Sequence, residues 1–179
     1  MVGLLLSGLA ATLIAPFIVR LPVRRAAWLP GIFPAAVLGY LLFSLPAIRA
    51  NRAISSSLAW APSLEVDLTF RLDGLSFLFS LLIAGIGLLV MLYASHYLEG
   101  HALLGRFYAY LMLFMMAMLG VAWSDHLLGL FVFWELTSVS SYLLIGFDHE
   151  EEKSRKAALQ ALLVTGGGGL ALLAGLVLL

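Results

Sequence analysis

The chain has 179 residues, of which 63% are hydrophobic and 11% charged, with no net charge and no cysteine. A soluble domain usually has about a quarter of its residues charged, so this composition, with a mean hydropathy of +1.05, indicates an integral membrane protein. Neutrality argues against a nucleic-acid partner, which needs a basic surface. The lack of cysteine excludes disulfides, thiolate metal sites, iron–sulfur clusters and cysteine nucleophiles.

Apolar stretches recur along the whole sequence, each close to the roughly 20 residues that a bilayer core requires. They predict an all-α membrane protein with about six transmembrane helices, at residues 1–19, 26–48, 74–95, 107–123, 126–147 and 157–179. Arg20, Arg24 and Arg25 follow the first stretch, whereas a cleaved secretory signal carries its positive charge before the apolar segment. We therefore expect the first stretch to be a helix of the mature protein.

One connection, 49–73, is much longer than the others and divides the chain into two N-terminal helices (1–48), this loop, and four further helices (74–179). Within it, 64–72 reads L-E-V-D-L-T-F-R-L, a strict alternation of apolar and polar residues. Period two predicts a strand with one face against an apolar surface. We expect a strand or hairpin on the outer membrane face, with an irregular loop as the alternative.

The positive charges predict the orientation, because cytoplasmic loops are enriched in Lys and Arg. Seven of them lie in the connections between helices 1 and 2, 3 and 4, and 5 and 6 (the 1–2, 3–4 and 5–6 connections), at positions 20, 24, 25, 106, 153, 155 and 156. The other three lie in the connection between helices 2 and 3, at 49, 52 and 71. We expect a multi-pass protein of the cell membrane. The 1–2, 3–4 and 5–6 connections would face the cytoplasm, and the N-terminus would lie outside.

Glu135 interrupts the fifth apolar stretch near its middle, in F-V-F-W-E-L-T-S-V-S-S-Y. An acidic residue at that depth costs about 2.5–3.5 kcal/mol on insertion scales, so its default interpretation is functional. Ser138 and Tyr142 share its helical face at i+3 and i+7, and Ser141 borders that face. We expect this supporting polar face to meet other helices or a hydrated cavity, with Glu135 binding protons. A structural hydrogen bond between helices is the alternative.

Asp73, Asp125 and His126 lie at predicted helix starts. N-capping accounts for Asp73 and Asp125; a role in a loop or at the mouth of an ion path is the alternative for all three. His96 and His101 match no strong metal-ligand spacing, and no metal or cofactor site is predicted.

The glycine run 166–169 has no following lysine and lies inside an apolar stretch, so it is no phosphate loop. It predicts a local bend, and a small-residue face that permits close helix packing is expected at Thr165, Gly167, Ala171 and Gly175. No hydrolase or nucleotide-binding motif is present, and we do not expect an enzyme.

Two stretches resemble a known family: F-R-L-D-G-L-S-F-L-F-S-L-L-I at 70–83 and F-V-F-W-E-L-T-S-V-S-S-Y-L-L-I-G-F at 131–147. Both are similar to the antiporter-like subunits shared by Mrp-type Na+/H+ antiporters, membrane-bound hydrogenases and the proton-pumping arm of respiratory complex I. The resemblance extends from about Trp60 onward. The W-E-L-T-S sequence, with E-K-S-R-K-A at 152–157, most resembles the A-type subunit of the Mrp antiporters.

The resemblance implies that Glu135 matches a proton-transfer glutamate on the fifth helix, which in the family pairs with a lysine on a broken seventh helix. That lysine has no counterpart before Leu179, so we expect an N-terminal piece of a longer subunit. The implied partners are the other subunits of a multisubunit antiporter, Na+, H+ and the lipid bilayer. A proton-pumping subunit of a complex I-like or hydrogenase complex, and a non-transporting scaffold, are the alternatives.

Overall fold

A computed structural model describes residues 1–18, 26–61, 66–99, 101 and 103–178. The described residues form six α-helices, a short 3-10 helix and one two-stranded antiparallel sheet. In chain order these are α1 (Val2–Ile18), η1 (Ala26–Gly31), α2 (Ile32–Arg49), β1 (Ile54–Ala61), β2 (Val66–Leu72), α3 (Gly74–Tyr97), α4 (Leu104–Trp123), α5 (Leu127–Ile145) and α6 (Glu152–Val177). The predicted all-α class with one small hairpin is confirmed.

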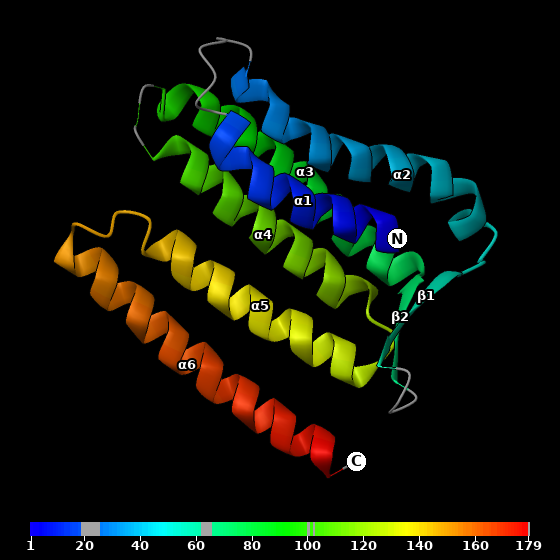
Figure 1. Cartoon of the computed structure of the whole chain (residues 1–179). Coiled ribbons are helices and arrows are strands. Elements are labelled where there is room, and N and C mark those ends of the chain that lie inside the picture. The colour runs from blue at the N-terminus through cyan, green and yellow to red at the C-terminus, as the bar shows by residue number, and fades with distance from the viewer. Residues whose placement is uncertain (19–25, 62–65, 100, 102, 179) are drawn as a thin grey trace.

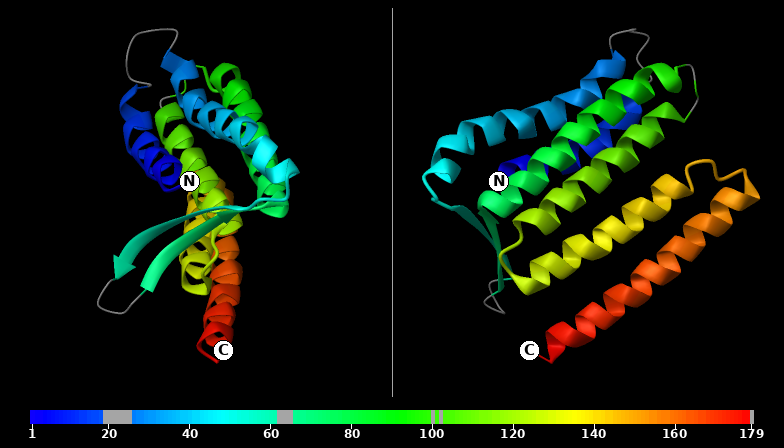
Figure 2. Two further views of the ribbon diagram at one scale, coloured as in Figure 1. Left: turned by 90° about the vertical axis from the view of Figure 1, so that its right-hand side faces the viewer. Right: turned by 180° about the vertical axis from the view of Figure 1, so that it is seen from behind.

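The six helices run side by side, and α4 lies at the centre of the bundle (Figure 1). Helices α1, α3 and α5 all pack against α4, while α2 packs on α3 and α6 packs on α5. Figure 2 shows α6 at the outer edge of this arrangement, with the hairpin crossing one end of the bundle. Among the described elements, α6 therefore contacts the bundle chiefly through α5.

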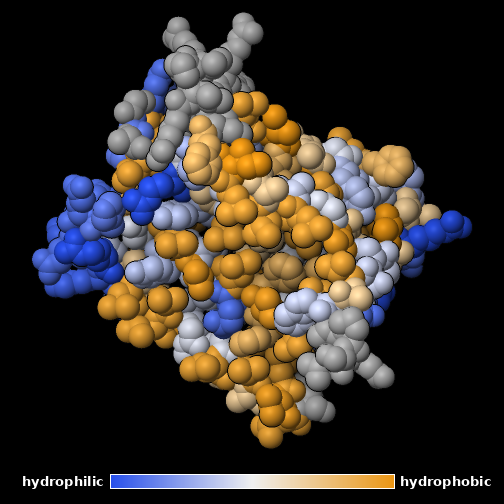
Figure 3. All heavy atoms as spheres, in the orientation of Figure 1, coloured by the Kyte–Doolittle hydropathy of each residue, from blue (hydrophilic) through white to orange (hydrophobic). Residues whose placement is uncertain are grey.

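Five described helices are long and apolar enough to cross a membrane, and α1, with 17 residues, is a shorter apolar helix. Figure 3 shows a broad hydrophobic band across one face of the molecule, with hydrophilic residues gathered at its two ends. Arg20, Arg24 and Arg25 lie outside the described residues. The band and the helix lengths are those expected of a multi-pass membrane protein.

Two helices begin earlier than the apolar pattern predicts, because charged residues form their first turns. Helix α4 begins at Leu104, and the Arg106 guanidinium donates to the Tyr110 hydroxyl at 3.1 Å one turn later. Helix α6 begins at Glu152, whose carboxylate pairs with Lys156 at 2.7 Å. Pairs at i,i+4 support a helix, so an apolar stretch alone marks its start too late.

The hairpin confirms the predicted strand and adds a partner for it. Strand β2 pairs with β1 in antiparallel register, Ile54 opposite Leu72 and Ser56 opposite Phe70. Phe70 and Leu72 are buried while Arg71 is exposed, so period two places the apolar side chains on the bundle. The first two residues of the predicted strand lie outside the described residues.

A left-handed residue at the end of α2 turns the chain into the hairpin. Asn51 has a φ of 55°, and its N–H donates to Ile48 O at 2.9 Å. The next N–H, of Arg52, donates to Ala47 O at 3.0 Å. This pair of bonds satisfies carbonyls that the helix end leaves without partners.

The core centres on α4, whose Tyr108, Leu119 and Trp123 side chains are fully buried. Methionines 112, 115 and 116 are buried beside them and act as packing residues. Near the hairpin, the Trp123 indole N–H donates to the Ser80 hydroxyl at 2.7 Å. This buried bond joins α3 to α4.

Candidate functional site

Glu135 lies near the middle of α5 and is half-buried. Its carboxylate oxygen Oε1 is fully buried and has no hydrogen-bond partner among the described residues. A buried polar atom without a partner is uncommon in folded proteins and calls for a functional or structural reason.

The carboxyl group of Glu135 lies against the backbone of α6 at Gly169. A Cβ added at Gly169 would overlap Oε1 and would come within 2.8 Å of the carboxyl carbon. Gly169 is buried, and it and Ala158 are the only buried residues of α6 between Glu152 and Val177. The carboxyl therefore occupies the place where any other residue at position 169 would put its side chain.

Helix α5 presents a different face to α4. Phe133 lies two residues before Glu135, which corresponds to about 200° around a helix of 3.6 residues per turn. A Cβ added at Gly120 of α4 would meet the Phe133 ring. The two helices that flank α5 thus each offer a glycine, one beneath the ring and one beneath the carboxyl.

The predicted supporting polar face does not hydrogen-bond to Glu135 in the part of the chain that the structure describes. Ser138 is buried, and its hydroxyl donates within the helix to Trp134 O at 3.4 Å; Ser141 is half-buried and Tyr142 is exposed. Ser140 is the more buried serine, with its hydroxyl donating to Leu136 O at 2.8 Å. Ser140 lies seven residues after Phe133 and therefore shares the face toward α4. The position of Glu135 alone does not indicate this placement of Ser140.

Within residues 103–178, all of which the structure describes, no cationic side chain lies near Glu135 along the helices. Between 157 and 177, α6 has no ionisable residue, and between 107 and 123, α4 has only Tyr108 and Tyr110. The Tyr108 hydroxyl donates to Met91 O at 3.3 Å, and the Tyr110 hydroxyl accepts from Arg106. Glu135 is therefore the sole carboxylate within these spans.

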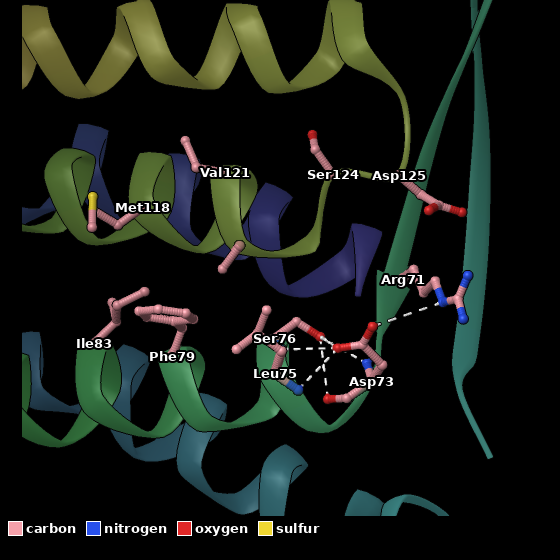
Figure 4. Close-up of a pocket in the computed structure, with 11 residues that line it drawn as sticks. Arg71, Asp73, Leu75, Ser76, Phe79, Ile83, Met118, Val121, Ser124 and Asp125 are labelled. Atoms are coloured by element: carbon pink, nitrogen blue, oxygen red, sulfur yellow. Dashed lines mark hydrogen bonds and ion pairs between the residues drawn. The ribbon is translucent and has the colours of Figure 1, made fainter. Parts of the chain in front are cut away.

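A second polar region lies at the hairpin end of α3, beside a pocket of about 370 Å³. Figure 4 shows the residues that line this pocket. Asp73 caps α3: its carboxylate accepts the N–H groups of Leu75 and Ser76, both at 3.0 Å, and the Ser76 hydroxyl accepts from the Asp73 N–H at 2.7 Å. The bond from the Ser76 N–H, with help from Leu75 and the Arg71 guanidinium at 4.0 Å, lowers the pKa of Asp73 from its usual 3.8. The predicted capping role of Asp73 is confirmed.

The capping role predicted for Asp125 is wrong. Helix α5 is capped by His126, whose Nδ1 accepts the Leu128 N–H at 3.2 Å. The Asp125 N–H instead donates to Thr69 O of β2 at 2.9 Å, which holds Asp125 against the hairpin and starts the helix one residue later. Its exposed carboxylate lines the same pocket as Asp73.

The small-residue face predicted for α6 meets no other helix in the described part of the chain, so its role in close packing stays a prediction. Thr165 and Ala171 are exposed, and a Cβ added at Gly167 or Gly175 would meet no atom within 4 Å. The approach to α5 runs instead through Ala158, near Gly146, and through Gly169, three turns further along. Helix α6 continues without interruption through the glycine run.

Two family models match the chain in succession. Residues 59–108 match the family described as NADH-ubiquinone oxidoreductase (complex I), chain 5 N-terminus, and residues 124–179 match NADH:quinone oxidoreductase/Mrp antiporter, TM. The A1 subunit of the Na(+)/H(+) antiporter of Staphylococcus aureus is 44% identical over 168 residues, which is 93% of this chain and 21% of that protein. The chain belongs to the Mrp antiporter-like subunit family.

Solved structures agree with this membership. The Mrp complex from Dietzia sp. DQ12-45-1b matches with a TM-score of 0.81 and 34% identity, over 96% of this chain and 18% of that chain. The archaeal membrane-bound sulfane sulfur reductase matches with a TM-score of 0.79 and 21% identity, over 96% and 26%, a likeness that shows the shared fold. The chain thus spans about a fifth of the length of the curated relative that it matches. Both stretches that carried the sequence resemblance, 70–83 and 131–147, fall inside the ranges that the two family models match.

Proposed function

We propose that this chain forms part of the A-type subunit of a multisubunit Na+/H+ antiporter, in which Glu135 binds and releases protons near the middle of the membrane. The 44% identity to the S. aureus antiporter protein supports the antiporter assignment. The single observation that supports the role of Glu135 is its buried Oε1, which has no hydrogen-bond partner among the described residues.

The chemistry of this carboxyl suits proton exchange. An oxygen that already accepts strong hydrogen bonds must give them up, or rearrange them, when a proton binds. Oε1 has no such bond within the described chain, and the neighbouring spans place no fixed cation beside it. Because burying an unpaired charge is unfavourable, a proton or a mobile cation that reaches this carboxyl would change its energy strongly. That sensitivity is what coupling between two ions requires.

A proton-pumping subunit of a complex I-like assembly is the second candidate, because residues 59–108 match a family described by complex I chain 5. Exchange driven by Na+ distinguishes the antiporter from a pump driven by a redox reaction. The identity to an antiporter protein over 93% of the chain favours the antiporter.

We also propose the orientation that the positive charges predict. The connections after α3 and after α5 lie at one end of the bundle, and the hairpin, the N-terminus and the end of α6 lie toward the other (Figure 1). Lys153, Arg155 and Lys156 stand at the first of these ends, so the positive-inside rule places it in the cytoplasm.

The test uses inverted membrane vesicles that contain the complete antiporter with all its subunits. In these vesicles, Na+-dependent dissipation of a pH gradient is measured for the wild type and for Glu135→Gln, which keeps the shape of the side chain but binds no proton. We expect exchange to fall below about a tenth of the wild-type rate while a native gel shows the complex intact. Glu152→Gln is the matched control, since Glu152 is an exposed acid on α6. Persistent exchange in an assembled Glu135→Gln complex would refute the role of Glu135.

A further inference from the structure

The four glycines at 166–169 are not equivalent. A Cβ added at Gly166, Gly167 or Gly168 would meet no atom within 4 Å, whereas one at Gly169 would overlap the carboxyl group of Glu135. Helix formation disfavours glycine by about 1 kcal/mol relative to alanine. Packing in the described structure therefore gives a reason for glycine at position 169 and at none of the other three.

The contact at Gly169 differs from an ordinary small-residue contact between helices. Elsewhere on this interface, a Cβ at Gly146 would lie 3.2 Å from the Ala158 Cβ, so two backbones approach each other there. At Gly169 the approaching group is the end of a long side chain, which can rotate away if its place is taken. A methyl group at 169 would thus displace the carboxyl and leave the helices where they are.

We propose that Gly169 is a positioning residue that keeps the Glu135 carboxyl against the α6 backbone, in the location where it exchanges protons. This inference rests on the proposed function, because it requires Glu135 to carry the proton. Oε1 is buried and lies where a Cβ at position 169 would be, so any side chain at 169 would move it out of that place. A displacement of about 1 Å in a reacting group can reduce a rate a hundredfold.

The experiment compares Gly169→Ala with Gly168→Ala in the complete antiporter, again by Na+-dependent dissipation of a pH gradient in vesicles. The two variants add the same methyl group to the same helix one residue apart. We expect Gly169→Ala to lower exchange about tenfold or more at an unchanged amount of assembled complex, and Gly168→Ala to stay within about twofold of the wild type.

A second pair of variants separates positioning from packing. Glu135→Asp shortens the side chain by one methylene and removes the overlap with a methyl group at 169. In that background we expect Gly169→Ala to change exchange by less than about twofold, so that the two substitutions are strongly non-additive. An equal loss in both backgrounds, or failure of Gly169→Ala to assemble, would overturn the inference, because Gly169 would then act through helix packing.

The outcomes also separate this inference from the proposed function. If Glu135→Gln abolishes exchange and Gly169→Ala matches Gly168→Ala, the positioning role alone is refuted. If Glu135→Gln retains exchange, the proposed function fails and the positioning role fails with it.

Discussion

Replacing Ser80 by alanine should destabilise the bundle by removing the buried partner of the Trp123 indole. Both side chains are fully buried, and the indole N–H donates to the Ser80 hydroxyl at 2.7 Å. A buried donor left without a partner costs about 1–3 kcal/mol, while hydrogen bonds between membrane helices measure about 0.6 kcal/mol on average and about 1.7 at most. We therefore expect Ser80→Ala to lower the free energy of unfolding by about 1–2 kcal/mol.

Ser44 provides a matched control for Ser80. Both are buried serines whose hydroxyls donate within their own helix, Ser80 to Ser76 O at 2.6 Å and Ser44 to Tyr40 O at 2.8 Å. Ser80 also receives the indole N–H of another helix, so the difference between the two alanine variants isolates that bond. Ser44→Ala should change stability by less than about 0.5 kcal/mol.

The assay is unfolding of the purified chain by SDS in mixed micelles, followed by far-UV circular dichroism. In a Trp123→Phe background the indole donor is gone, so Ser80→Ala should then cost much less than in the wild type. If Ser80→Ala is no more destabilising than Ser44→Ala, or if its cost is unchanged in Trp123→Phe, the interhelical bond contributes little and the reasoning is wrong.

Two further predictions concern the hairpin end and the orientation. Asp73→Ala should lower stability by about 1 kcal/mol through loss of the α3 cap, whereas Asp73→Asn should retain most of it. Because the pKa of Asp73 is lowered on folding, its ionised form stabilises the protein above pH 3.8. In thermal unfolding, the stability advantage of the wild type over Asp73→Asn should therefore vanish as pH falls below that value. A stability advantage that persists at lower pH would contradict this prediction. Since the chain has no cysteine, Ser57→Cys and His149→Cys each introduce a single cysteine that a membrane-impermeant maleimide can label in intact cells. We expect the label on Ser57→Cys alone. Label on His149→Cys alone would reverse the proposed orientation.

The hairpin and the α3 cap were predictable because the residues involved lie close together in the sequence. The alternation that ends at Phe70 and Leu72 requires one apolar surface, and any packed bundle supplies it. Asp73 and Ser76 satisfy each other three residues apart, which needs no tertiary partner at all. At the start of α5 the same reasoning fails, because the Asp125 backbone is held by Thr69, a residue of another element.

The surroundings of Glu135 were predictable only in part. Hydropathy identifies a lone acid within an apolar span, and helical spacing indicates which residues share its face. Neither indicates which neighbouring helix that face meets. Helix α6 contains four adjacent glycines of equal hydropathy, whose positions face different directions around the helix. Only the packing of the helices identifies Gly169 as the one beside the Glu135 carboxyl.

The direction of the Glu135 carboxyl is set from the opposite face of its own helix. The Phe133 ring lies over Gly120 of α4 and packs edge-on against Phe70 of β2, with ring centroids 5.9 Å apart. A ring held on two sides fixes the rotation of α5 about its axis, because turning the helix would drive the ring into one neighbour or the other. With that rotation fixed, Glu135, about 200° away, faces α6. Gly120, beneath the ring, and Gly169, beneath the carboxyl, thus act together. Gly120 helps to set the direction of the Glu135 side chain, and Gly169 leaves space for its carboxyl group.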